Sequence, residues 1–136
     1  MNVERLKKHF LIVLMCIGTV GCSDFSICEN TPEKVVASPN GELKAVIFDR
    51  GCGATTGFTT GVSILNSVED LSNADKGNVL LADGAYQETS RSANRVNFEA
   101  EWRSDTELLV RHSIATHKQS ESVGNVRIRF ERKYPE

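Results

Sequence analysis

The stretch Val96-Asn97-Phe98-Glu99-Ala100-Glu101-Trp102-Arg103 alternates strictly between apolar and polar side chains. Successive side chains of a β-strand point to opposite faces, so a period of two predicts a strand with one buried face and one solvated face. Ser104-Asp105-Thr106 follows with the composition of a turn. This stretch therefore predicts a strand that leads into a hairpin.

Two later segments continue the same pattern. In the first segment, Leu108, Val110 and His112 continue the buried face. In the second segment, Val126, Ile128 and Phe130 alternate with Arg127, Arg129 and Glu131. With the strand at 96–103 they predict three antiparallel strands, the last two joined by a loop around residues 114–124. Glu99 and Glu101 then lie on the solvated face near Arg127 and Arg129, where cross-strand ion pairing explains them.

The N-terminal half shows shorter strand patterns. The apolar runs 35–37 and 43–48 are separated by Ser38-Pro39-Asn40-Gly41, which predicts a β-hairpin. Further strands are expected at 62–65 and 78–82, with loops at 51–61, 66–77 and 83–94. No segment has the 3.6-residue apolar period of a helix. We therefore expect a mainly β protein, an antiparallel sheet or a small open barrel of six or seven strands.

The N-terminus has the parts of a secretory signal. Basic residues precede an uninterrupted apolar run, Phe10 to Val20, which is too short to span about 30 Å of hydrocarbon as a permanent helix. The run ends in Thr19-Val20-Gly21-Cys22, which resembles a bacterial lipobox. We expect residues 1–21 to be a cleaved signal helix and Cys22 to be the lipid-bearing first residue of the mature protein. The alternative is that Cys22 is a disulfide partner behind an ordinary signal.

The mature chain has the length of one domain, and its composition excludes several partners. Removing the signal takes away three basic residues and one acidic residue, which leaves 13 Lys and Arg against 17 Asp and Glu. This balance implies no basic surface for nucleic acid or for anionic lipid. We expect residues 22–33 to be a tether and residues 34–136 to be a single β domain.

The four cysteines have separate expected fates. Cys16 leaves with the signal and Cys22 is committed to lipid, so Cys28 and Cys52 remain as a pair in a compartment that oxidises thiols. We expect a disulfide between them. Closing a loop of this length would contribute roughly 3 kcal/mol on the chain-entropy model.

Several motifs resemble a family of small, functionally uncharacterised bacterial envelope proteins, often lipoproteins, with an S-P-[DN]-G, then C-G-A-T-T, then V-S-I pattern. The matching residues are Ser38-Pro39-Asn40-Gly41, Cys52-Gly53-Ala54-Thr55-Thr56, Val62-Ser63-Ile64, Trp102 to Leu108, and Val126-Arg127-Ile128. The resemblance covers nearly all of the mature chain. It implies a β fold and an envelope location, and it supplies no catalytic residues.

The segment 52–60 has the most unusual composition in the chain. Backbone amides near hydroxyl groups can bind a small anion or the edge of a peptide. The candidate binding residues of this segment are Gly53, Thr55, Thr56, Thr59 and Thr60. The alternative is a purely structural loop in which glycine serves the turn beside the disulfide. His112 and His117 show no metal-ligand spacing, so we expect no metal and no cofactor.

These observations favour a lipid-anchored envelope protein with a non-catalytic binding domain. Its expected partners are the membrane, through lipid on Cys22, and an envelope protein or cell-wall component. Ser23 follows the cysteine, and enterobacteria mark inner-membrane retention with Asp there, so in a Gram-negative host we expect the outer membrane, facing the periplasm. One alternative is an inhibitor or immunity protein against a wall-degrading enzyme. Another is an enzyme that uses Thr55 or Thr56 with His112.

Overall fold

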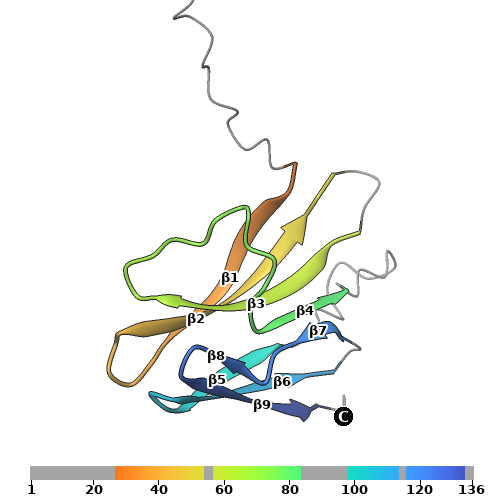
Figure 1. Cartoon of the computed structure of the whole chain (residues 1–136). Helices are drawn as coiled ribbons and strands as arrows, with labels where there is room; N and C mark the ends of the chain where they lie inside the picture. The colour runs from red at the N-terminus through yellow and green to blue at the C-terminus, as the bar shows by residue number, and fades with distance from the viewer. Residues whose placement is uncertain (1–26, 54–56, 84–97, 114–115, 134–136) are drawn as a thin grey trace, which may run out of the picture.

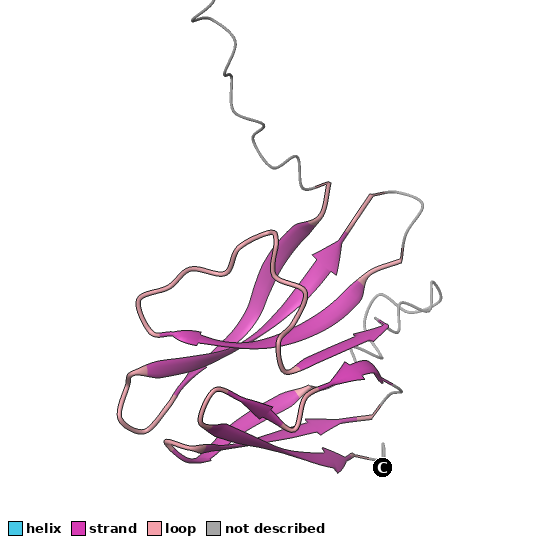
Figure 2. Cartoon of the chain, viewed as in Figure 1, coloured by secondary structure: helices cyan, strands magenta, loops and turns pink. Residues whose placement is uncertain are grey.

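The computed structural model describes residues 27–53, 57–83, 98–113 and 116–133. The regular secondary structure of these residues is entirely β-strand, as Figure 2 shows. The mainly β class is therefore confirmed. The described strands number nine, more than the six or seven expected, and they are β1 (Glu29–Ala37), β2 (Leu43–Gly51), β3 (Thr59–Asn66), β4 (Leu80–Asp83), β5 (Glu99–Ser104), β6 (Glu107–His112), β7 (Thr116–Gln119), β8 (Ser122–Val123) and β9 (Val126–Arg132).

The strands form two sheets, which we call sheet A and sheet B (Figure 1). Sheet A has the order β1-β2-β3-β4-β7 and is antiparallel throughout. Sheet B has the order β5-β6-β9-β8. The expected signal helix, Cys22 and nearly all of the loop expected at 83–94 lie outside the described residues.

The expected hairpin of β1 and β2 is present. The Ser38 amide donates to the Leu43 carbonyl at 2.8 Å, and Gly41 turns the chain with a φ of 74°. However, β1 begins at Glu29, so the last five residues of the expected tether belong to the sheet. Four of these five side chains are exposed, so the start of β1 has no buried apolar face and lacks the alternation of a half-buried strand.

The expected pairing of the C-terminal strands needs a correction. β5 and β6 form the antiparallel hairpin, but β6 and β9 pair in parallel. The segment 114–124, expected to be a loop, contains β7 and β8 instead. After β6 the chain crosses to the edge of sheet A as β7 beside β4, then returns as β8, which pairs antiparallel with β9. This crossing reverses the chain direction once more than a simple hairpin would, so β9 runs parallel to β6.

The strand expected at 78–82 also begins later than predicted. β4 begins at Leu80, and Asn78 extends the pairing through its side chain. The Asn78 side-chain amide accepts from the Ile64 amide and donates to the Ile64 carbonyl, both at 2.8 Å. A side-chain amide thus satisfies the backbone of β3 where the neighbouring strand has ended.

The main core lies between the two sheets, which face each other through their alternating apolar residues. Trp102 on β5 donates from its indole nitrogen to the Val36 carbonyl on β1 at 2.9 Å. Asp105 accepts from the Asn40 amide at 2.8 Å, which ties the two hairpin turns together. The core residues are Ala45, Ile47, Val62, Ile64, Val79, Leu80 and Ala82 from the sheet A side and Phe98, Ala100, Leu108, Val110, Val126 and Ile128 from the sheet B side.

A smaller apolar cluster lies on the other face of sheet A. Val46, Phe48 and Leu65 pack there under Leu71, which belongs to the segment 67–78 that we call the covering segment. Gly61 on β3 faces Phe48, and a side-chain Cβ at this position would overlap the phenylalanine ring. The irregular structure expected at 66–77 is confirmed, and this segment is a packed part of the domain.

A buried arginine holds the covering segment in place. Arg50 is 8% exposed, and its Nη1 donates to the Asn30 side-chain oxygen at 2.9 Å and to the carbonyls of Asn73 and Asp75, both at 2.8 Å. The Asn30 side-chain nitrogen donates to the carbonyls of Ser72 and Asp75 at 2.7 and 2.8 Å. The polar start of β1 therefore connects β2 to the covering segment.

Candidate functional site

The disulfide between Cys28 and Cys52 is present and closes a sequence separation of 24 residues. It joins the chain just before β1 to the chain just after β2. Glu29 and Gly51, the next residues inward, are the first pair of the β1–β2 ladder. The bond therefore closes the open end of the hairpin opposite its turn, and it fixes where the Gly- and Thr-rich segment begins.

The residues expected to form a binding loop are divided between different kinds of structure. Thr59 and Thr60 are the first residues of β3. Their hydroxyls hydrogen-bond to neighbours on β2, Thr59 to the Arg50 carbonyl at 3.5 Å and Thr60 to the Asp49 carboxylate at 3.3 Å. Gly53 has a φ of 111°, which agrees with the expectation of a turn beside the disulfide. Thr55 and Thr56 lie outside the described residues.

His112 belongs to the core, as its place in the alternating pattern predicts. It is buried between the rings of Phe98 and Phe130, with ring centroids 6.2 and 6.0 Å away. Its Nε2 lies 3.0 Å from the Gln119 side-chain nitrogen. Within the described ranges, no group of three or more His, Cys, Asp or Glu residues is placed to hold a metal ion. His117 is a residue of β7.

The outward face of sheet B carries a ladder of charged side chains, which we call the charged face. These residues alternate with the buried ones on three strands and are Glu99, Glu101 and Arg103 on β5, Glu107 and Arg111 on β6, and Arg127, Arg129 and Glu131 on β9. Lys133 follows β9. Basic residues therefore outnumber acidic ones by one here, although the full sequence has 18 Asp and Glu against 16 Lys and Arg.

Arg111 lies at the centre of an ion-pair network on this face. Its guanidinium contacts Glu131 at 2.8 Å, Glu101 at 2.9 Å and Glu99 at 3.9 Å. The hydrogen bond to Glu131 is the main reason that the pKa of Arg111 is raised, and the bond to Glu101 adds to it. Lys133 contacts Glu99 at 2.7 Å, and this hydrogen bond holds the pKa of the Glu99 carboxyl below its ordinary value.

The expected partners of Glu99 and Glu101 need a correction. They pair with Arg111, Lys133 and Arg103 rather than with residues of β9. The reason is the strand order, since β6 lies between β5 and β9 and brings Arg111 into the position where Arg127 and Arg129 were expected. The prediction of cross-strand ion pairing is itself correct.

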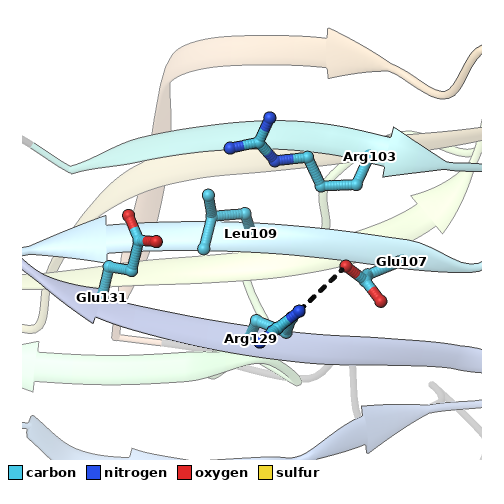
Figure 3. A pocket seen from close by; sticks show the side chains of 5 residues that line it. All are labelled: Arg103, Glu107, Leu109, Arg129 and Glu131. Atoms are coloured by element: carbon cyan, nitrogen blue, oxygen red, sulfur yellow. Dashed lines mark ion pairs between the residues drawn. The ribbon is translucent and has the colours of Figure 1, made fainter.

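A shallow pocket of about 290 Å³ lies in the charged face, lined by Arg103, Glu107, Leu109, Arg129 and Glu131. Figure 3 shows the Leu109 side chain between Arg103 on one side and Arg129 and Glu131 on the other. The Arg129 side chain is 68% exposed, and its contact with Glu107 is 3.8 Å long. Leu109 is 4% exposed and forms an apolar floor between the two arginines. The sequence signal for it is Leu109, an apolar residue at an outward position of β6.

Comparisons with protein-family models, with curated proteins and with solved structures find no match for this chain. Among the described residues, no helix has the length and apolar character needed to cross a membrane.

Proposed function

We propose that this chain is a lipid-anchored protein of the bacterial cell envelope whose β domain is a non-catalytic binding module. The charged face is its contact surface. The anchor comes from the signal-like N-terminus and Cys22, which precedes the disulfide-bonded Cys28 by a short polar stretch. In Figure 1 the beginning of β1 and the strands of sheet B lie at opposite ends of the molecule. Sheet B is thus directed away from the point of attachment and toward other envelope components.

The observation that carries this proposal is the pocket around Leu109. Arginine is enriched at the centres of protein interfaces because its planar guanidinium makes bidentate bonds to carboxylates while its stem packs on apolar surface. Arg129 makes one long contact with Glu107, so pairing with a partner's carboxylate would displace little. The partner is therefore an envelope protein or a cell-wall component that presents carboxylates beside a small apolar group.

Site-directed photo-cross-linking in the bacterium that makes the protein tests the contact surface. A photoactivatable residue at Arg129 should form a discrete adduct, and the same residue at exposed Lys76 on the covering segment should not. The charge reversal Arg103→Glu with Arg129→Glu should remove the adduct, whereas Lys76→Glu should retain it. Equal labelling at both positions, or an adduct that survives the double reversal, would contradict the proposal.

Lipid attachment has a separate test. Cys22→Ala should leave a soluble or uncleaved product, because alanine has no thiol to which lipid can be attached. Detergent phase partitioning and mass spectrometry of the N-terminus measure this. A substituted protein that still partitions into detergent at its mature length would remove the anchor from the proposal.

A further inference from the structure

Two exposed apolar side chains lie beside the disulfide, at what we call the anchor end, defined by Ile27, Cys28, Cys52 and Phe58. Ile27 is 71% exposed and directly precedes Cys28. Phe58 is 54% exposed, and its ring edge lies against Gly51, the neighbour of Cys52. A single exposed large apolar residue is common on protein surfaces. Here two such residues lie at the same end of the domain.

The sequence around Phe58 is also unusually free of charge. The described residues 51–53 and 57–60 include no Asp, Glu, Lys or Arg, although charged residues make up 25% of the chain. The described hydroxyls at this end, those of Thr59 and Thr60, hydrogen-bond to β2. Apart from the exposed carboxylate of Glu29, the described residues beside the two apolar side chains are therefore uncharged, and little charge has to leave water when these side chains do.

The attachment point holds this surface close to the membrane. Six backbone steps separate Cys22 from Cys28, and six steps at full extension span at most about 20 Å. The disulfide joins Cys28 to Cys52, so the tether holds the start of the segment that carries Phe58 as well as β1. β3 begins beside Phe58, and its eight residues lead roughly 26 Å away to its far end.

We propose that Phe58 and Ile27 insert into the interfacial region of the lipid bilayer, so that the anchor end of the domain rests on the membrane. The inference depends on the proposed lipid anchor. Phenylalanine and other apolar side chains bind at the boundary between headgroups and acyl chains. Two side chains alone bind weakly, but the tether makes their insertion intramolecular, and a high effective concentration then populates a weak contact.

The chemistry of the anchor end also indicates which lipid it contacts. Glu29 is exposed and follows Cys28, so a carboxylate lies at the same end as the two apolar side chains. An anionic lipid surface would repel this carboxylate, whereas a zwitterionic surface would not. The occupant is therefore a zwitterionic bilayer surface. Docked in this way, the domain directs the charged face away from the membrane and toward its partner.

Tryptophan quenching in the full-length lipidated protein tests the inference. Phe58→Trp and the matched control Val68→Trp are reconstituted in phosphatidylcholine vesicles that contain a lipid with a nitroxide near the headgroup end of its acyl chain. Val68 is 93% exposed but follows the far end of β3. The native protein, whose one tryptophan is Trp102, supplies the background. Ile27→Trp is a second reporter, and urea unfolding verifies that each variant folds.

Quenching at position 58 should be at least about twofold stronger than at position 68, because an inserted ring and the nitroxide occupy the same depth. Position 27 should follow position 58. Equal quenching at all three positions, in protein that floats with the vesicles, would overturn the membrane contact and leave the anchor intact. Protein that fails to float would overturn the anchor and this inference together. Protection of the indole introduced by Phe58→Trp only after envelope proteins are added would assign the anchor end to a protein instead.

Discussion

Replacing Arg50 with methionine should release the covering segment and lower the free energy of unfolding by about 3 kcal/mol. Arg50 is buried, and its Nη1 is shared among three oxygens, from Asn30, Asn73 and Asp75. One Nη1 carries two hydrogens, so it makes at most two full hydrogen bonds. Bonds to a charged group contribute about 1.5–3 kcal/mol each, and the removed desolvation cost of the charge offsets part of the loss.

Methionine keeps an unbranched apolar stem at this position of β2, so the change isolates the loss of the guanidinium. Arg127→Met is the matched control, because Arg127 is an exposed arginine on β9 and its loss should change stability by less than about 0.5 kcal/mol. Urea unfolding followed by Trp102 fluorescence measures both variants. Hydrogen exchange at the Ser72 and Val79 amides should accelerate in Arg50→Met. A variant with an unchanged urea midpoint and unchanged exchange would refute this account of the covering segment.

Three further predictions concern stability and ionisation. Replacing Cys28 and Cys52 together with alanine should lower the free energy of unfolding, measured in urea, by about 2–4 kcal/mol and leave sheet B intact, because the disulfide mainly restricts the unfolded chain. A loss below about 1 kcal/mol would contradict this explanation. Gly61→Ala should cost about 1–3 kcal/mol in thermal unfolding, because its Cβ overlaps the ring beneath it on β2, and a neutral effect would show that this ring can move. The pKa of Glu99 is lowered in the folded state, so its contribution to stability is present above the ordinary carboxyl pKa of about 4.3 and is lost as the pH falls through the lower folded value. Lys133→Met should therefore raise the pKa of Glu99 in an NMR titration, and an unchanged titration would argue against the contact.

The predictions that held were those that depend only on local sequence, such as the alternation of side chains within one strand or the residues of one turn. Strict alternation at 96–103 predicted β5 and its inward face, and the turn residues 38–41 predicted the hairpin of β1 and β2. His112 was placed in the core because it follows Leu108 and Val110 at every second position of β6. A period of two is a local property of the backbone, so it survives in the fold wherever one face is buried.

The candidate sites show the limit of this reasoning. The unusual composition of residues 51–60 indicated a loop beside the disulfide. The described residues 52–53 and 57–58 are indeed outside the strands, but the last two residues of the segment begin β3. The pocket around Leu109 was missed, because an apolar residue among charged neighbours has no meaning until β5 and β9 are placed on either side of β6. The same strand order gave Glu99 and Glu101 their actual partners.

By itself, the sequence determined the mainly β class, the pairing of Cys28 with Cys52 and the inward faces of β5, β6 and β9. The tertiary structure alone decided that there are two sheets, that β6 and β9 run parallel, and that the polar start of β1 holds the covering segment through Arg50. The physical reason is that alternation records burial and carries no information about which strand lies beside which. Short edge strands such as β8, and polar side chains that bond to distant carbonyls, become recognisable only when the chain brings their partners within hydrogen-bond distance.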